Sequence, residues 1–399
     1  MLKTILISEL KPGMYVQGVV KQQGSVKVKS EGWVRTQAAI NKLAKSGILE
    51  VSVDPDKFID LNAEKNNDSS ENAIETPKFD PTKATASFSS EANKAKKLYT
   101  EAKQLQSKAF DDIRAGRKID VAPFKQVASG FIDSVFRNQD ALACMTRIRE
   151  KDAYLLEHSI NVSVLMSIFA KHMGFEREVI HELATGALLH DIGKIKVPDA
   201  ILNKPGKLTD AEFDEIKRHA LYSKEILEES ELSDIAIQVA GFHHERLDGK
   251  GYPFGLKGDE INQYVRMISI VDVYDALTAK RVYKDGMNPI QAFKIIRSDC
   301  PNSFDSELVA RFIQCIGIHP VGTLVKLKSQ KLGIVSQSNF EQPLKPTVKV
   351  FYSAKHQHYT EVQDLNLASN RIDDELESSI KPEDFGIDLI KLFRNAFFD

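Results

Sequence analysis

The sequence of 399 residues predicts a mainly α-helical protein with a small α+β domain at its N-terminus and a small β-rich appendage near its C-terminus. Residues 86 to about 316 form a succession of amphipathic, capped helix patterns, whereas short alternating runs of β-branched residues begin after Pro320. The apolar content of 42% can fill a core, and the net charge of −2 gives no electrostatic reason to bind a nucleic-acid polymer or an anionic membrane. We therefore expect a folded protein of two or three domains.

Strand and helix signals alternate in the N-terminal domain, which we place at residues 1–60. A strand is expected in MYVQGVVKQQG after the turn at Pro12, then a helix between Thr36 and Gly47, then the strand ILEVSV. Residues 61–85 are polar and acidic and predict a linker. A sensing role and a scaffolding or oligomerisation role both remain open for this domain.

A connecting helix is expected over residues 86–123, because an apolar stripe recurs there at spacings of three and four. The stripe consists of Ala95, Leu98, Ala102, Leu105, Ala109 and Ile113. It packs either on the rest of the chain or on a second subunit as a short coiled coil, so a homodimer or a signalling-protein partner stays open. A helical domain at 124–318 follows, and an appendage of about three strands with a last helix near 389–398 occupies residues 319–399.

The opening MLKTILISELKPGMYV lacks a cationic segment before a long apolar core, and no stretch approaches the roughly 20 apolar residues of a membrane span. We therefore expect a cytoplasmic protein. Cys144, Cys300 and Cys315 are widely spaced, which favours buried thiols over a disulfide framework or a zinc knuckle.

Histidines and aspartates recur in the helical region at positions that face the core. They are His158, His190, Asp191, His219, His243, His244 and Asp272. One such side chain alone is typical of a satisfied core residue. Together they need a common partner, because each unpaired buried polar group costs on the order of a few kcal/mol.

A metal cluster is the simplest common partner. Imidazole and carboxylate ligands without cysteine favour iron, manganese or another first-row dication over a structural zinc ion. An aspartate between two sets of ligands is suited to bridging two ions roughly 3.5–4 Å apart, and two such ions can polarise one phosphate. The pattern therefore predicts metal-assisted hydrolysis of a phosphoester.

The stretches HDIGK and HHERLDGKGYP resemble the HD-GYP family, a branch of the HD superfamily of metal-dependent phosphohydrolases. The helix of His158, the run LLHDIGKIKVPDAILNKPGKLT, the helix of His219 and the run VDVYDALTAKRVYK follow in the family's order. The resemblance implies an all-helical catalytic domain that hydrolyses cyclic dinucleotides, chiefly cyclic di-GMP, in bacterial signalling. It also implies that residues 1 to about 55 are the small domain of unknown role that often precedes such modules.

The resemblance further implies a role for each matched residue of the metal site. The seven histidines and aspartates named above would be the metal ligands. Asp191 would bridge the ions and Lys194 would lie beside the attacked phosphate. A water activated by the ions would attack one phosphorus in line with the leaving 3′ oxygen, and Lys194 would stabilise or protonate on the phosphate side.

The GYP segment would bind the substrate. Gly249 and Gly251 let the backbone turn close to the ligand, Tyr252 offers a ring and a hydroxyl, and Pro253 fixes the turn. Two cations further along, Arg281 and Lys284, match family positions that grip the phosphate, although they also fit two solvated cations at a helix end.

One position departs from part of the family. Members with three metals carry a glutamate one helical turn before the first histidine, and here Tyr154 stands at that position. Glu157 is adjacent to His158 and points about 100° away around the helix. We therefore expect two divalent ions, iron or manganese.

Several alternatives stay open. The substrate is either cyclic di-GMP or cyclic GMP-AMP, since no motif marks the residues that read the bases. A linear pGpG product could be cut further to GMP, and the oxidation state of iron could control activity. A receptor that binds a cyclic dinucleotide without cutting it is a further alternative, disfavoured by the intact HD and GYP motifs.

Overall fold

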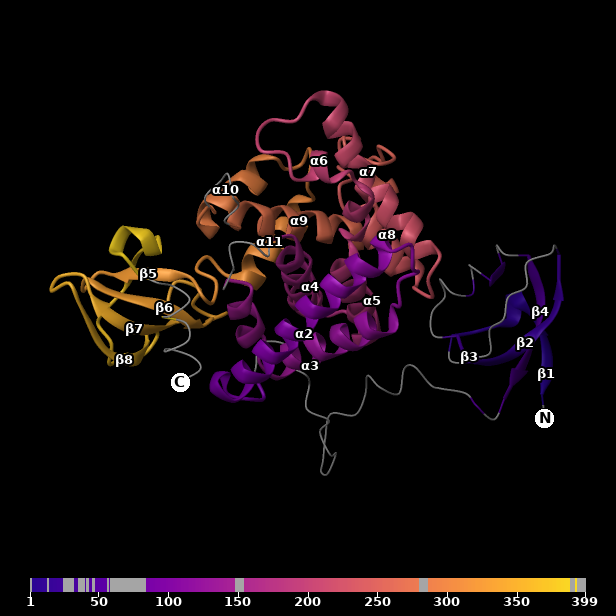
Figure 1. Ribbon diagram of the computed structural model, residues 1–399. Coiled ribbons are helices and arrows are strands. Elements are labelled where there is room, and N and C mark those ends of the chain that lie inside the picture. Colours follow the sequence, from indigo (N-terminus) through magenta and orange to yellow (C-terminus); the bar gives the residue numbers. More distant parts are fainter. Residues whose placement is uncertain are drawn as a thin grey trace, which may run out of the picture. The chain divides into compact units, whose positions relative to one another are not determined.

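The computed structural model describes residues 2–12, 14–23, 32–34, 40, 43–44, 47–55, 57, 84–147, 154–279, 286–387 and 392. The chain divides into two compact units, Met1–Lys78 and Phe79–Asp399. Helices make up most of the second unit, and each unit carries one small sheet (Figure 1). The predicted mainly α-helical fold with small β parts is confirmed.

The first unit is a four-stranded antiparallel sheet in the order β1-β4-β2-β3. Its elements are β1 (Lys3–Leu6), the short helix η1 (Ile7–Glu9), β2 (Tyr15–Gln22), β3 (Gly32–Trp33) and β4 (Ile48–Asp54). Both strands predicted here, now β2 and β4, are confirmed, and Gly47 takes the left-handed conformation, with φ of 81°, just before β4. Most of the predicted helix, Thr36 included, lies outside the described residues, as does the predicted linker up to residue 83.

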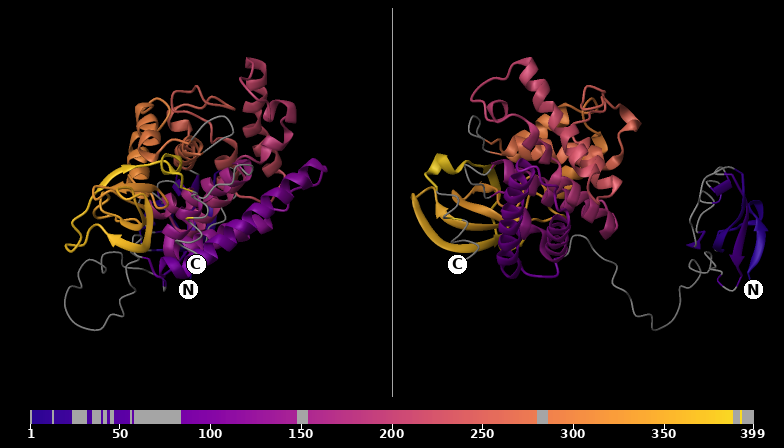
Figure 2. Two further views of the ribbon diagram at one scale, coloured as in Figure 1. Left: turned by 60° about the vertical axis from the view of Figure 1, so that its left-hand side comes forward. Right: turned by 45° about the vertical axis from the view of Figure 1, so that its right-hand side comes forward.

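The second unit begins with four long helices. They are α2 (Phe88–Arg114), α3 (Ala122–Met145), α4 (Tyr154–His172) and α5 (Arg177–Leu189). Ser87 caps α2 by accepting a hydrogen bond from the amide of Ser90. The alanines of the predicted stripe on α2 are buried against the unit's own core, where α2 runs along α3 (Figure 2). This stripe therefore packs within the chain.

Shorter elements complete the helical part. They are η3 (Ile192–Lys196), α6 (Asp199–Leu202), α7 (Asp210–Glu228), α8 (Asp234–Gly241), η4 (Gly258–Glu260), α9 (Gln263–Thr278), α10 (Pro289–Ser298) and α11 (Ser306–Ile316). A capping box formed by Thr209 and Glu212 opens α7. Apolar residues surround α4 and α9 on nearly every side, which is typical of helices at the centre of a core. Polar side chains on these two helices are therefore buried and need partners.

The C-terminal sheet has five antiparallel strands in the order β8-β7-β6-β5-β9, so the expectation of about three strands was wrong. The strands are β5 (Leu324–Leu327), β6 (Lys331–Gln337), β7 (Thr347–Ser353), β8 (His358–Asn366) and β9 (Leu376–Ser379), and the helix η5 (Pro382–Phe385) follows. The two unexpected strands lie at the edges of the sheet, and β8 is exposed along most of its length, so neither shows the apolar alternation by which strands are predicted. The sheet shares one hydrophobic core with the helices.

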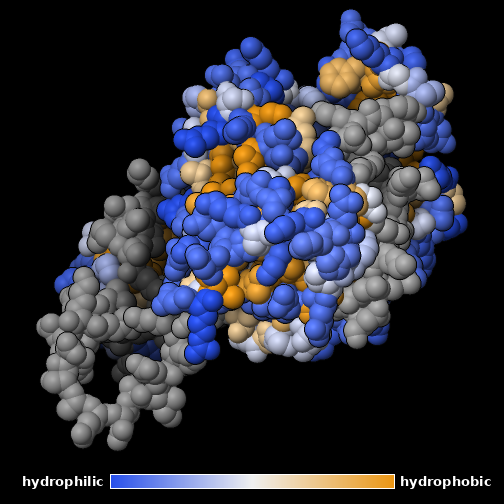
Figure 3. Space-filling model, turned by 90° about the vertical axis from the view of Figure 1, so that its left-hand side faces the viewer, coloured by the Kyte–Doolittle hydropathy of each residue, from blue (hydrophilic) through white to orange (hydrophobic). Residues whose placement is uncertain are grey.

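Three further observations concern the surface, the apolar length of the helices and the chain end. On the face drawn in Figure 3, hydrophilic side chains predominate and apolar ones appear in small groups between them. No helix among the described residues is long and apolar enough to cross a bilayer. The helix predicted near residues 389–398 lies outside the described residues, apart from Leu392.

An ion pair joins α2 to α3. The carboxylate of Glu91 is fully buried, and Arg137 donates to both of its oxygens, at 2.8 Å from Nε and 2.7 Å from Nη2. Burial opposes ionisation of Glu91, but the two hydrogen bonds from Arg137 hold its pKa below the ordinary value. The carboxylate is therefore ionised, with Arg137 as its main partner and Lys94 a further 3.9 Å contact.

The Arg137→Ala variant should lose about 3 kcal/mol of unfolding free energy, because it leaves a buried carboxylate without its main partner. Urea denaturation followed by circular dichroism measures this loss. The matched control is Arg117→Ala, which removes an exposed partner of Asp112 and should cost less than about 1 kcal/mol. Equal small losses in the two variants would contradict the proposed importance of the buried pair.

Candidate metal centre

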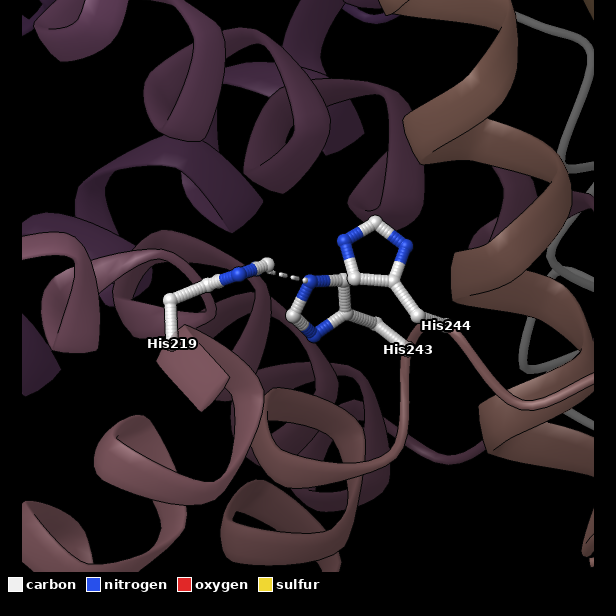
Figure 4. A group of neighbouring side chains, drawn as sticks. All are labelled: His219, His243 and His244. Atoms are coloured by element: carbon white, nitrogen blue, oxygen red, sulfur yellow. Dashed lines mark hydrogen bonds between the residues drawn. The ribbon is translucent and has the colours of Figure 1, made fainter. Parts of the chain in front are cut away.

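The seven predicted ligands converge from five parts of the helical unit. His158 comes from α4, His190 and Asp191 from the end of α5, His219 from α7, His243 and His244 from the segment after α8, and Asp272 from α9. All are buried except His244, whose side chain is 25% exposed. Figure 4 shows three of the rings lying against one another. Among the seven, His244 is therefore the side chain that is most open to solvent.

The ligand atoms fall into three overlapping groups within which all atoms lie within 4.8 Å of one another. These groups are His158 with His190 and Asp272, His219 with His243 and His244, and His190 with Asp191 and His243. The first two groups share no member. The third group lies between them and contains Asp191.

The two carboxylate oxygens of Asp191 face different groups. Its Oδ2 lies 3.7 Å from Nε2 of His158 and 3.5 Å from Nε2 of His190. Its Oδ1 lies 3.3 Å from Nε2 of His219 and 3.9 Å from Nε2 of His243. This is the placement that a carboxylate bridging two ions requires.

Backbone carbonyls fix the tautomers of three histidines. The Nδ1 atoms of His190, His219 and His243 lie 2.8, 2.6 and 2.7 Å from the carbonyl oxygen of the residue three positions earlier. A carbonyl only accepts, so each Nδ1 carries a proton, and in the neutral ring Nε2 presents a lone pair. Metal-binding histidines are commonly oriented by such a bond on the other ring nitrogen.

The centre consequently brings lone pairs into contact. The dashed contact in Figure 4 joins the Nε2 atoms of His219 and His243 at 3.3 Å, and a ring that is protonated only at Nδ1 presents a lone pair there. Nε2 of His190 and Oδ1 of Asp191 are also buried, and neither forms a hydrogen bond with the described part of the chain. Buried acceptors that face each other without a donor are unfavourable, and divalent cations would satisfy all of them. The residues therefore fit a metal cluster with nitrogen and oxygen ligands.

The protonation states suit metal binding. Burial lowers the pKa of His190, lowers that of His243 well below the ordinary value, and lowers that of His244 to about 3. Burial alone would raise the pKa of Asp191, but Lys194 and the neighbouring histidines hold it well below the ordinary value. Neutral imidazoles and an ionised carboxylate are the forms that bind metal ions.

The carboxylate of Asp275 orients the ring of His158. Nε2 of His158 lies 2.9 Å from Oδ1 of Asp272, and Nδ1 of His158 lies 2.8 Å from Oδ2 of Asp275. Burial disfavours a charged ring, yet these two hydrogen bonds raise the pKa of His158 to about 9. An ion held by His158 and Asp272 would replace the Nε2 proton, while Asp275 would keep its hydrogen bond to Nδ1. Sequence analysis missed Asp275, although its spacing of three residues from Asp272 places both on one face of α9.

Close packing of α7 shapes the HDIGK turn. A Cβ at Gly193 would lie 2.1 Å from the carbonyl oxygen of His219, so only glycine fits. Ser223 of α7 accepts a hydrogen bond from the amide of Gly193 at 2.9 Å and donates one to the carbonyl of His190 at 2.6 Å. The same turn brings Nζ of Lys194 to 2.5 Å from Oδ2 of Asp191.

Glu245, which sequence analysis also missed, holds the GYP segment in place. This buried carboxylate accepts hydrogen bonds from the amides of Phe254 at 2.7 Å and Leu256 at 2.9 Å. A Cβ at Gly251 would lie 2.4 Å from the amide nitrogen of Arg246, so the loop folds back closely on the segment after the two histidines. The sequence feature that could have pointed to Glu245 is its position directly after the two adjacent histidines, in a polar loop.

This folding places Tyr252 at the centre. The centroid of its ring lies 4.6 Å from that of His244, and Pro253 follows in a cis peptide bond. Of the other predicted substrate-binding residues, Arg281 and Lys284 lie outside the described residues. The carboxylate of Glu157 turns away from the centre and pairs with Lys103 of α2 at 3.1 Å.

Comparison with known proteins agrees with this geometry. A family model described as an HD domain matches residues 142–308, and one for a domain of unknown function matches residues 2–124. The chain is 36% identical over 362 residues to a cyclic di-GMP phosphodiesterase of Pseudomonas aeruginosa, covering 89% of this chain and 86% of that protein. The chain belongs to the HD-GYP family.

Other relatives are similar to this HD-GYP protein over a shorter span. One is a 3′3′-cGAMP-specific phosphodiesterase of Vibrio cholerae, 38% identical over 43% of this chain and 37% of that protein. Another is a probable cyclic di-GMP phosphodiesterase of the same organism, 44% identical over 34% of this chain and 32% of that protein. Relatives named for two different cyclic dinucleotides thus share the HD-GYP region.

The Asp275→Asn variant should bind manganese about 10- to 100-fold more weakly, because it weakens the bond that orients His158. Competition with a chelator of known affinity, titrated against the purified protein, measures the dissociation constant. The matched control is Asp234→Asn, which changes an exposed carboxylate in the first turn of α8. An unchanged metal affinity in Asp275→Asn would show that His158 needs no such partner.

Proposed function

We propose that this chain is a metal-dependent phosphodiesterase that hydrolyses cyclic di-GMP to linear pGpG in second-messenger signalling. The single observation that carries the proposal is Asp191, whose two oxygens face two separate groups of ligands. The relative from Pseudomonas aeruginosa, named for cyclic di-GMP and similar over nearly the whole chain, supports the choice of substrate.

Two divalent ions, iron or manganese, fit the ligand set best. His158, His190 and Asp272 would hold one ion, His219, His243 and His244 would hold the other, and Asp191 would bridge them. The absence of sulfur ligands from these groups favours these metals over structural zinc. Two ions rather than three follow from Tyr154 in the sequence and from Glu157, which is committed to Lys103.

When bound, the ions would supply an activated water and offset the charge that develops on the attacked phosphate. Lys194 contacts Asp191 and keeps 19% of its side chain exposed, so its ammonium group can reach a phosphate beside the centre. There it would donate to a phosphate oxygen or protonate the leaving 3′ oxygen. Tyr252, held by the turn of Gly251 and Pro253, would bind the substrate beside His244. Phosphate binding by Arg281 and Lys284 stays a prediction.

Cyclic GMP-AMP is the second candidate substrate, because a relative of the catalytic region is named for it. That similarity spans less than half of this chain, whereas the similarity to the cyclic di-GMP enzyme spans most of it. Further cleavage of pGpG to GMP, a homodimer or signalling partner, redox control and a cytoplasmic location stay predictions.

Product analysis tests the proposal. Purified protein loaded anaerobically with ferrous iron or manganese would be given cyclic di-GMP and cyclic GMP-AMP in parallel, with metal counted in the same samples. Linear product with about two ions per chain is the expected result. Tight binding without product at full metal loading would make the protein a receptor instead.

The Asp191→Ala variant should lose turnover of cyclic di-GMP by about 1,000-fold or more, because it removes the bridge between the two ion positions. Its metal content should also fall below that of the wild type. Single-turnover assays and elemental analysis check both outcomes, with Asp234→Asn as the control. Activity near that of the wild type would refute the bridging role.

A further inference from the structure

A cavity of about 200 Å³ lies beside Lys194 on the side where α2 passes the HDIGK turn. Its walls include Phe110, Asp111 and Arg114 of α2, Leu156 of α4, Lys194 of η3 and Leu202 of α6. A water takes about 30 Å³ in the liquid, so the cavity has room for several waters or for one flat ring system of nucleobase size. None of the family motifs supplies the α2 wall.

The two polar groups on that wall are exposed and could turn toward a ligand. Asp111 and Arg114 lie three residues apart on one face of α2. The carboxylate of Asp111 forms no hydrogen bond or ion pair with the described part of the chain, and its side of the helix is exposed. Arg114 has a contact of 3.6 Å with Asp199, and both side chains are more than half exposed, so this contact holds Arg114 only weakly.

The side chain of Lys194 connects the cavity with the candidate metal centre. Lys194 lines the cavity, and its ammonium nitrogen lies 2.5 Å from Oδ2 of Asp191. In a cyclic dinucleotide every phosphate is flanked by two nucleosides, so a phosphate held at Lys194 brings a base within the length of one ribose. The cavity lies on this side and has room for that base.

The chemistry of the walls favours guanine over adenine. An ionised aspartate only accepts hydrogen bonds, and guanine presents two neighbouring donors, N1–H and N2–H₂, where adenine presents an acceptor at N1. An arginine pairs with the O6 and N7 acceptors of guanine, whereas adenine has a donor beside N7. The ring of Phe110 and the side chains of Leu156 and Leu202 add apolar surface for the faces of the base.

We propose that this cavity is a guanine subsite, in which Asp111 and Arg114 of α2 select the nucleoside next to the attacked phosphate. The inference rests on the proposed phosphodiesterase function and deepens it. Cyclic di-GMP fits in either orientation, because both of its bases are guanine. Cyclic GMP-AMP fits with only one of its two bases in the subsite, so it is cut at one of its two phosphodiester bonds, and cyclic di-AMP is a poor substrate.

The test compares kcat/KM for cyclic di-GMP and cyclic di-AMP in the full-length, manganese-loaded protein. Asp111→Asn and Arg114→Gln should each lower the value for cyclic di-GMP by about 10- to 100-fold and reduce the preference for it over cyclic di-AMP. The matched control is Glu101→Gln, which neutralises a carboxylate of α2 that does not line the cavity. Calorimetric binding of cyclic di-GMP to protein stripped of metal by a chelator should weaken in the same two variants.

A substrate without bases separates the two proposals. Hydrolysis of bis(p-nitrophenyl) phosphate should be unchanged in Asp111→Asn and Arg114→Gln, which shows that the variants are folded and their metal centre intact. If wild-type protein cleaves this ester but no cyclic dinucleotide, the proposed function fails. If wild type cleaves cyclic di-GMP and both variants keep its preference over cyclic di-AMP, the guanine subsite is refuted while the phosphodiesterase stands.

Discussion

The arrangement of the helical unit depends on a group of buried acceptor atoms that point at one another. The Nε2 atoms of His190, His219 and His243 and the carboxylate of Asp191 face a common space, and the backbone bonds at Nδ1 prevent three of the rings from turning away. Such a group is unfavourable without cations and strongly stabilised with them. The surrounding helices must therefore be packed firmly enough to keep the acceptors together, and α4 and α9, most of whose residues are buried, meet that need.

Hydroxyl groups and carboxylates from neighbouring elements hold the backbone or the ring of several candidate ligands in place. Ser223 joins α7 to the HDIGK turn, and Ser269 of α9 donates a hydrogen bond of 2.7 Å to the carbonyl of His243. Asp275 fixes the ring of His158, and Glu245 fixes the loop that carries Tyr252. His158, His190 and His243 are thus each tied to a neighbouring element, so that a shift of one helix would displace a candidate ligand on another.

The sequence predicted which histidines and aspartates come together, and the order of the helices, because both depend on local pattern. Histidine and aspartate types stand out in apolar helices, and caps such as Thr209 mark helix starts. The supporting residues could not be predicted in the same way, because the role of Ser223 or Glu245 depends on which distant backbone atoms come near it. The edge strand β8 was missed for a related reason, since strands exposed on both faces need no apolar alternation.

The position of α2 relative to the metal centre is fixed by three polar contacts along one face of that helix. Tyr99 donates to Asn161 at 2.7 Å, Lys103 pairs with Glu157 at 3.1 Å, and Gln106 donates to the carbonyl of Leu188 at 2.5 Å. The first two partners flank His158 on α4, and the third lies two residues before His190. A slide of α2 by one turn would break all three contacts together, so the register of the helix is set by the segments that carry the candidate ligands. Asp111 and Arg114, one to two turns beyond Gln106, therefore keep a constant distance from those ligands, as residues that read a substrate must.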